Sequence, residues 1–395
     1  MWNLRLALAS AFVLGFVGCG EAGDAVRATV SVAEAMSSDT VGYARADRVR
    51  PFDFPADHGP HPGFKTEWWY VTGNLRATDG SGRRFGVQFT VFRSALAPGD
   101  TASRASGWAT RQLYMSHVAL SDLAAEAFYA EEQFARGAAG LAGAAADPVR
   151  ATLGTARLTA AGEGTGAVPL QIDGEADGAA FSLLARPVKP VVLQGDRGLS
   201  QKGDGAGNAS YYYAQTRMAT EGTVTLPGPA GSGQPPEVVP VEGLTWFDRE
   251  WSTSALGEGQ VGWDWFALHL DDGRDLMLYQ LRRSDGSKDP LSEGSLVGRS
   301  GDKTRLDAGD FSLDPLGAWE SPDGGAYPTR WRVRVPSAGI DAEVTAALDA
   351  QELDATIRYW EGAVDVEGTV MGVGFLEMTG YADGLEGSAR PTPGA

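Results

Sequence analysis

Residues 85–91 alternate large apolar side chains with glycine or polar ones, and this period of two is the feature that most restricts the fold. An α-helix would scatter such a pattern around its axis, whereas a β-strand collects the apolar side chains on one face. A second strand is expected at 68–75, and residues 79–82, Asp-Gly-Ser-Gly, have the composition of a tight turn. These segments together predict a β-hairpin.

The same pattern returns in the second half of the chain. Residues 263–270 and 276–281 are expected strands, and Asp-Asp-Gly at 271–273 separates them as a turn. Helical signal is scarce, and residues 124–135 are the best short candidate for a helix. Strands at short spacing without alternating helices favour barrels or sandwiches over a parallel sheet. The sequence therefore predicts an all-β protein with two related sheets.

The composition agrees with a folded chain that is rich in turns. Glycine contributes 53 of the 395 residues and 43% of the chain is hydrophobic, which excludes a mainly disordered protein. The 33 basic and 51 acidic residues give a net charge of −18. Because neutralisation of phosphates supplies most of the affinity for nucleic acids, this charge excludes them as expected partners. It also disfavours adhesion to anionic lipid through electrostatics alone.

The N-terminus has the features of an export signal. Arg5 precedes an apolar run at 6–17, which is too short to span a bilayer. Residues 16–19, Phe-Val-Gly-Cys, resemble a bacterial lipobox, in which the cysteine is acylated and becomes the mature N-terminus. We therefore expect a signal peptide at 1–18 and a lipid anchor at Cys19. Simple signal cleavage without acylation is the alternative.

The same segment predicts where the protein is located. A lipid-anchored protein of this kind is expected on the periplasmic side of the bacterial cell envelope. Gly20 follows the cysteine where an Asp would favour retention, so the outer membrane is expected rather than the inner one. Cys19 is the single cysteine of the chain, so no intramolecular disulfide can form.

Stretches of small, polar and proline-rich sequence divide the remaining chain. A flexible tether is expected at 19–50 and a disordered tail at 384–395. Residues 227–237 are rich in Pro and Gly and form either a link or a long hairpin loop. Two folded domains are therefore expected, at 51–226 and 238–383.

Carboxyl groups among aromatic residues are the candidates for catalysis. Strand alternation places Asp264 on one face with Phe266 and Leu268, and it places Asp248 and Glu250 on one face with other apolar side chains. Burial disfavours the charged form of a carboxyl group and so raises its pKa, which suits a general acid near neutral pH. The alternative is that each acid forms a structural ion pair with a buried arginine. The catalytic candidates are Asp264, Glu250, Asp248 and Glu67.

Aromatic residues surround these acids and are the candidates for ligand binding. They are, together with one further acid, Trp68, Trp69, Tyr70, Trp246, Trp251, Trp263, Trp265, Tyr359, Trp360 and Glu361. His58 and His61 lie close together, but no third ligand follows at a recognised spacing, so no metal and no other cofactor is predicted. His117 is expected to be a core residue with one hydrogen bond.

Several of these segments resemble the AttH-like family, the lipocalin-like group that includes carotenoid 1,2-hydratase and is often labelled as predicted secreted hydrolases. The matching segments are residues 61–70, 246–251, 262–265, 359–362 and 374–381. The resemblance implies two tandem lipocalin-like β-barrel or sandwich domains with an apolar ligand cavity. In the hydratase branch an acid protonates a polyene double bond, aromatic rings stabilise the cation and water adds.

Three functions are consistent with the sequence. The first is an envelope lipoprotein that binds an isoprenoid or another apolar small molecule or lipid in a β-barrel cavity and hydrates or isomerises it. The second is a non-catalytic carrier or chaperone for a lipid or lipoprotein that works with an envelope ABC transporter. The third is a glycoside hydrolase, since paired carboxyl groups beside tryptophan also suit that reaction.

Overall fold

The computed structural model describes residues 40–99, 110–162, 164, 166–228, 231, 233–254 and 256–381. The expected signal peptide, the lipid anchor at Cys19 and the tail at 384–395 lie outside these residues. The described chain contains two short 3-10 helices, η1 (Ala56–His58) and η2 (Pro336–Ala338). All its other regular elements are β-strands. The prediction of an all-β fold is confirmed.

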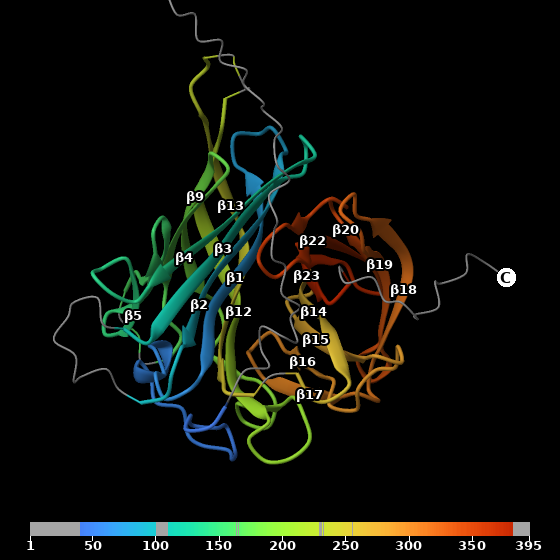
Figure 1. Cartoon of the computed structure of the whole chain (residues 1–395). Coiled ribbons are helices and arrows are strands. Elements are labelled where there is room, and N and C mark those ends of the chain that lie inside the picture. Colours follow the sequence, from blue (N-terminus) through green and yellow to red (C-terminus); the bar gives the residue numbers. More distant parts are fainter. Residues whose placement is uncertain are drawn as a thin grey trace, which may run out of the picture.

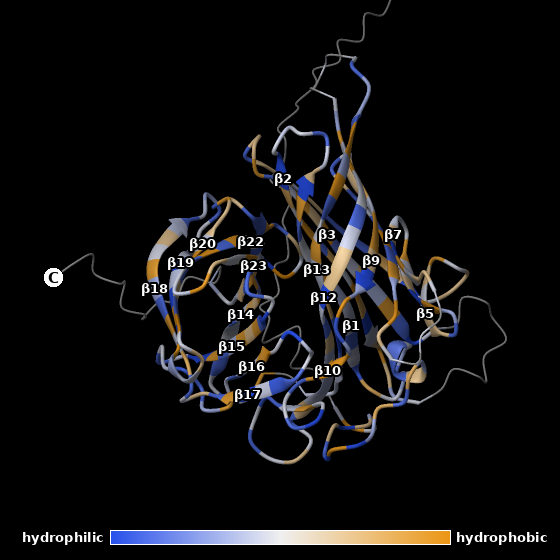
Figure 2. Cartoon of the chain, turned by 180° about the vertical axis from the view of Figure 1, so that it is seen from behind, coloured by the Kyte–Doolittle hydropathy of each residue, from blue (hydrophilic) through white to orange (hydrophobic). Residues whose placement is uncertain are grey.

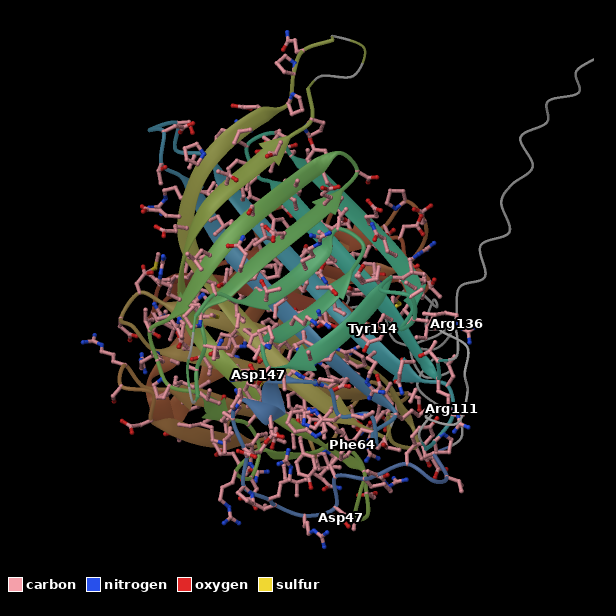
Figure 3. All side chains as sticks on the ribbon, turned by 90° about the vertical axis from the view of Figure 1, so that its left-hand side faces the viewer. Asp47, Phe64, Arg111, Tyr114, Arg136 and Asp147 are labelled. Atoms are coloured by element: carbon pink, nitrogen blue, oxygen red, sulfur yellow. The ribbon has the colours of Figure 1, made fainter. Side chains whose placement is uncertain are left out.

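The first sheet contains thirteen strands and curls until its two ends face each other (Figures 1 and 3). Its strands are β1 (Thr66–Ala77), β2 (Arg84–Ala95), β3 (Gln112–Asp122), β4 (Ala127–Arg136), β5 (Ala142–Ala146), β6 (Val149–Leu153), β7 (Ala156–Ala160), β8 (Leu170–Ala176), β9 (Ala179–Pro187), β10 (Val192–Leu193), β11 (Leu199–Gln201), β12 (Ala209–Leu226) and β13 (Glu237–Ser252). The order is β4-β3-β2-β1-β13-β12-β9-β8-β7-β6-β5, and β10 and β11 also pair with β12. Across the curl, β8 approaches β3 so closely that a Cβ on Gly174 would lie 2.8 Å from Val118 Cγ1.

The second sheet contains ten strands and lies beside the first (Figure 1). Its strands are β14 (Gln260–Leu270), β15 (Asp275–Arg283), β16 (Glu293–Val297), β17 (Lys303–Asp307), β18 (Ser312–Glu320), β19 (Ala326–Val335), β20 (Ile340–Ala346), β21 (Glu352–Leu353), β22 (Tyr359–Gly368) and β23 (Gly372–Thr379). The order is β17-β16-β15-β14-β23-β22-β20-β19-β18, with β21 paired to β22. Both sheets are near-barrels, as expected of two lipocalin-like β domains.

The segment at 227–237 connects two neighbouring strands of the first sheet. Strands β12 and β13 flank it and pair in antiparallel register from Leu226 opposite Glu237 to Ser210 opposite Ser252. The first sheet therefore ends at Ser252, and the boundary expected at 227–237 is corrected to the stretch between β13 and β14. Pro and Gly suit a long hairpin loop as well as a link, and composition alone did not separate the two.

Two further expectations are corrected by the described residues. The helix expected over 124–135 is instead mostly β4, because each residue from Ala127 to Arg136 pairs with β3. Part of the expected tether is packed on the first sheet. Ala46 is buried, and the Ala44 amide donates a hydrogen bond of 2.8 Å to the Gly63 carbonyl. Order therefore extends at least to Thr40.

Three apolar cores follow from strand alternation. Trp69, Val71 and many other side chains fill the first barrel, and Phe266 and Leu268 belong to the core of the second. The third core lies between the sheets and joins β1, β12 and β13 to β14 and β15. Within it, the rings of Tyr70 and Trp265 meet edge to face at 5.3 Å. Figure 2 shows the hydrophobic stretches of these strands where the two sheets face each other.

Candidate functional site

A cavity of about 730 Å³ lies between the two sheets, outside both barrel cores. Trp68 and Tyr70 of β1 line it from the first sheet, and Trp263 and Trp265 of β14 line it from the second. Its size and its mostly apolar walls are typical of a site for a small molecule. The location differs from the expected barrel interior, because the side chains that line the cavity alternate with those that fill the cores.

Two acids of the second sheet meet in this cavity. Glu361 of β22 and Glu377 of β23 stand directly opposite each other in antiparallel register. Burial, with the nearby Glu250 charge, raises the pKa of Glu377 to about 7, although a hydrogen bond from Trp263 works against it. Burial and the Glu377 charge raise the pKa of Glu361 well above its usual range. Both carboxyl groups of this pair therefore bind a proton more strongly than an exposed carboxyl group does.

Hydrogen bonds fix the orientation of the two acids. The Tyr70 hydroxyl donates to Glu361 Oε1 at 2.6 Å, and Trp263 Nε1 donates to Glu377 Oε1 at 3.1 Å. Glu361 Oε2 is buried and has no hydrogen-bond partner among the described residues. When Glu361 is protonated, this oxygen can present its proton to a molecule in the cavity.

A second pair of acids comes from the first sheet. Asp248 and Glu250 of β13 both line the cavity. Asp248 accepts hydrogen bonds from Trp246 Nε1 at 2.8 Å and from the Tyr212 hydroxyl at 3.0 Å. Burial raises the pKa of Asp248 well above its usual range, and these two bonds reduce the effect only in part.

Glu250 differs from Asp248 because a cation lies beside it. The Lys202 ammonium is 3.7 Å from Glu250 Oε1 and 3.9 Å above the centre of the Tyr279 ring. Burial raises the pKa of Glu250, and the Lys202 charge is the main influence that lowers it. The Lys202 ammonium thus forms an ion pair with Glu250 and opposes the effect of burial, and its charge also acts on Asp248.

His117 also lines the cavity, although the sequence suggested only a core residue. Its Nδ1 is 2.7 Å from the Tyr359 hydroxyl, and its Nε2 is 2.9 Å from Glu132 Oε1. Met115, two positions earlier in β3, lines the same cavity, because alternate residues of a strand point to the same face. Sequence reasoning also gave no role to Lys202, Tyr212, Tyr279 or Glu377.

Asp264 does not line the cavity. As alternation predicts, it shares a face with Phe266 and Leu268, but this face belongs to the second barrel core. Asp264 accepts hydrogen bonds from Gln280 at 2.8 Å and from Tyr381 at 2.9 Å, and Arg282 Nε lies 3.3 Å from it. This arrangement matches the structural alternative, a buried acid paired with arginine.

Glu67 likewise lies outside the cavity. It is fully buried and forms ion pairs with Arg93 and Arg249, and it accepts a bond from the His61 amide at 3.0 Å. Burial alone would raise the pKa of Glu67, but the two guanidinium charges and His61 bring it well below its usual range. A carboxylate held in this way joins strands and does not donate a proton near neutral pH.

The aromatic candidates divide between the cavity and the barrel cores. Those that line the cavity are Trp68, Tyr70, Trp263, Trp265 and Tyr359, together with Glu361. Trp246 packs in the apolar cluster between the sheets without lining the cavity. Trp69 and Trp251 belong to the first barrel core, and Trp360 belongs to the second.

The described residues contain no group of three or more His, Cys, Asp or Glu side chains that could hold a metal ion. His61, which stands beside Asp57 and Glu67, stacks on Trp251 at 3.8 Å and is part of the Glu67 network. Within the same residues, no helix has the length and apolar character needed to cross a membrane.

Fold and site together define a class of protein: two curled β-sheets that enclose an apolar, aromatic cavity lined by buried acids. Residues 45–381 match the AttH-like family model, and the chain belongs to this family. The resemblance found in the sequence is confirmed.

Several known proteins are similar to this chain. A crystal structure of an AttH protein from Nitrosomonas europaea has 32% sequence identity and a TM-score of 0.72, and the match covers 86% of this chain and 99% of that one. Kievitone hydratase of Fusarium solani subsp. phaseoli is 25% identical over 215 residues, which are 50% of this chain and 56% of that protein. The chain thus matches little more than half the length of this curated relative.

The structure of kievitone hydratase from Nectria haematococca supports the fold alone. It has 15% identity to this chain and a TM-score of 0.61, and the match covers 86% of this chain and 98% of that one.

Proposed function

We propose that the protein adds water to a carbon–carbon double bond of an apolar small molecule, such as an isoprenoid, bound between the two sheets. The observation that carries this proposal is the Glu361–Glu377 pair. Two opposed, buried acids in an aromatic cavity both have raised pKa values, and one oxygen, Glu361 Oε2, has no partner among the described residues. The similarity to kievitone hydratase supports the same class of reaction.

The first step is transfer of a proton from the Glu361–Glu377 pair to one carbon of the double bond. The electron pair of the double bond forms the new C–H bond, and the other carbon becomes a cation. Aromatic faces attract cations, and Tyr70, Trp263 and Trp265 supply such faces beside the acids. A general acid whose pKa lies near the working pH is the most effective, which suits the pair that includes Glu377.

The second step is attack of water on the cation. The water oxygen forms the new C–O bond and one of its protons must leave. Glu250 is the proposed acceptor, because the Lys202 ammonium at 3.7 Å opposes the rise in the Glu250 pKa that burial causes. The two acids thus have different surroundings in one cavity, which suits one for the role of proton donor and the other for that of acceptor.

Labelled water tests this proposal. Purified protein is incubated with kievitone, squalene or an acyclic carotenoid in water that carries heavy oxygen, and the products are analysed by mass spectrometry. We expect a product that has gained one labelled water, and we expect Glu361→Gln and Glu377→Gln to lose it. The matched control is Glu343→Gln, in an exposed ion pair with Arg330 of the same sheet. Absence of labelled product from every probe would refute the proposal.

The carrier function remains the second candidate, and the apolar cavity between the sheets is the observation that favours it. A carrier, with or without an envelope ABC transporter as its partner, would retain the ligand through purification without converting it. Extraction with organic solvent followed by mass spectrometry identifies such a ligand. Retention by wild type and by Glu361→Gln alike, with no conversion by either, would favour the carrier. Binding of saccharides in place of apolar ligands would favour the glycoside hydrolase.

We also propose that Cys19 anchors the protein by acylation on the periplasmic side of the outer membrane. The lipobox-like Phe-Val-Gly-Cys at 16–19 and the following Gly20 support this location. Two acyl chains give stable anchoring where one is marginal. Fractionation of cells that express Cys19→Ala should find the protein released from membranes, and unchanged membrane association would refute acylation.

A further inference from the structure

The rim of the cavity carries exposed apolar side chains. Val41, Leu96 and Phe134 line the cavity and are nevertheless 77%, 57% and 49% exposed. Large apolar side chains that gather at one exposed place mark contact with a partner or a membrane, whereas scattered ones need no explanation. Here three of them surround the entrance of an apolar cavity.

Strand pairing shows that these side chains lie close together. Phe134 of β4 is opposite Met115 of β3, and Met115 also lines the cavity. Leu96 directly follows β2, and its amide donates a hydrogen bond of 2.7 Å to the Arg111 carbonyl at the start of β3. Neighbouring strands are about 4.8 Å apart. The ends of β2, β3 and β4 therefore bring Leu96 and Phe134 to the same edge of the first sheet.

Basic side chains accompany this rim in a chain that is strongly acidic overall. Lys65 lines the cavity, and Arg111 and Arg136 lie at the same edge of the first sheet (Figure 3). The Arg136 guanidinium donates to the Thr110 carbonyl at 3.4 Å, beside the start of β3. Each Lys or Arg near an anionic lipid surface favours binding. The local charge at the rim is thus opposite in sign to the net charge of −18.

The acids nearest to this rim have partners. Glu132 accepts bonds from His117 and from Thr356, and Asp354 lies 3.8 Å from the Arg358 guanidinium. Arg358 offsets the charge of Asp354, so Glu132 and Asp354 compensate the basic charge of the rim only in part.

The described chain also begins at this rim. Tyr43 donates a hydrogen bond of 2.9 Å to the Ala95 carbonyl, one residue before Leu96. A Cβ on Gly42 would lie 3.0 Å from Pro98 Cγ. The sequence that precedes Thr40 thus joins the fold beside the cavity entrance, and Cys19 lies 21 residues before it. Such a length spans at most about 75 Å, so an anchored chain would hold the rim within that distance of the membrane.

We propose that this rim docks onto an anionic phospholipid membrane, so that apolar ligands pass between the acyl layer and the cavity without crossing water. Val41, Leu96 and Phe134 enter the interface, while Lys65, Arg111 and Arg136 face the headgroups. The inference rests on the proposed function only for the apolar character of the ligand. The docking itself requires neither turnover nor a bound ligand.

Single-cysteine labelling tests the docking in the full chain. Cys19 is the only cysteine of the sequence, so Cys19→Ala provides a background without thiols. Leu96→Cys and Phe134→Cys then carry a nitrobenzoxadiazole probe at the rim. Leu316→Cys is the matched control, because Leu316 is 47% exposed on β18 of the second sheet and does not line the cavity. The vesicles contain phosphatidylethanolamine and phosphatidylglycerol, with brominated acyl chains for quenching.

At positions 96 and 134 we expect blue-shifted emission and bromine quenching when vesicles are added, and at position 316 we expect neither. Leu96→Glu combined with Phe134→Glu should weaken vesicle binding about tenfold or more, and Leu316→Glu should not. Equal responses at the three positions, or none, would overturn the proposal. Blue-shifted emission at the rim before vesicles are added would also overturn it, because the chain itself would then cover the rim.

The two proposals can fail separately. Hydration is assayed in detergent solution without vesicles, whereas docking is measured without ligand. Labelled product without insertion of the rim would leave the proposed function standing and remove the docking. Insertion of the rim into vesicles without labelled product would leave the docking standing and remove the proposed function.

Discussion

Replacing Glu67 by Gln is expected to destabilise the protein by about 3–5 kcal/mol. Glu67 is fully buried between Arg93 and Arg249, which are themselves 1% and 0% exposed. Glutamine keeps the shape of the side chain but removes its charge, so two buried guanidinium groups lose their common counter-ion. Loss of one member of a buried ion pair costs this much because the remaining charge stays uncompensated.

The measurement is urea unfolding followed by tryptophan fluorescence. Trp69 and Trp251 lie in the first barrel core with Glu67 nearby and report on this sheet. The control is Glu221→Gln in the same sheet, where Glu221 forms an exposed ion pair with Arg186. Exposed ion pairs contribute little to stability, so Glu221→Gln should leave the midpoint of urea unfolding unchanged. A loss below about 1 kcal/mol in Glu67→Gln would refute the structural role given to Glu67.

The difference in the free energy of unfolding between wild type and Glu67→Gln should depend on pH with a definite sign. The pKa of Glu67 is lower in the folded state than its ordinary value of 4.5. A lowered pKa gives stability that is present above the ordinary pKa and is lost as the pH falls through the folded value. The difference between wild type and Glu67→Gln should therefore stay constant from neutral pH down to about pH 5 and narrow in stronger acid. A difference that instead narrows toward alkaline pH would contradict the assignment.

Three further predictions concern the cavity and the second barrel. Glu377→Gln should remove a change in Trp263 emission centred near pH 7, because burial raises the pKa of Glu377 to about 7 and its carboxyl group accepts a hydrogen bond from Trp263. A fluorescence titration measures this change, and a transition that survives in the variant would contradict the prediction. Tyr70→Phe should move the alkaline limb of the pH–turnover profile to higher pH, because the Tyr70 hydrogen bond lowers the pKa of Glu361. An alkaline limb that moved to lower pH would argue against Glu361 as the general acid. Asp264→Asn should lower the thermal midpoint but keep ligand affinity and turnover, since Asp264 lies outside the cavity; a folded variant without turnover would show the opposite.

Strand positions were largely predictable from the sequence because local alternation and turn composition determine them. The strands expected at 68–75 and 263–270 lie within β1 and β14. The segment at 124–135 misled because Ala and Glu favour helices, whereas pairing with β3 determines its structure. A segment with weak local preference takes its structure from the neighbouring strand.

The site was less predictable because a strand between two cores has two buried faces. Alternation placed Asp264 correctly on an apolar face, yet the cavity lies on the other face of the same strand, with Trp263 and Trp265. Nothing in one strand tells which of its faces is opposed by a second sheet. Glu377 lies in one of the segments that match the family, but its role became clear only from its pairing with Glu361, sixteen residues earlier in the chain.

Because the central strands bury both of their faces, the position of the catalytic candidates depends on the register of these strands. In β22, Trp360 packs in the second barrel core, while its neighbours Tyr359 and Glu361 line the cavity. A substitution at a cavity position can therefore change the fit of a ligand without disturbing the core. A slip of β22 by a single residue would turn the acid into the core and the tryptophan into the cavity. Ligand preference in this fold can thus diversify by substitution, whereas insertions and deletions inside these strands would abolish the site and the fold together.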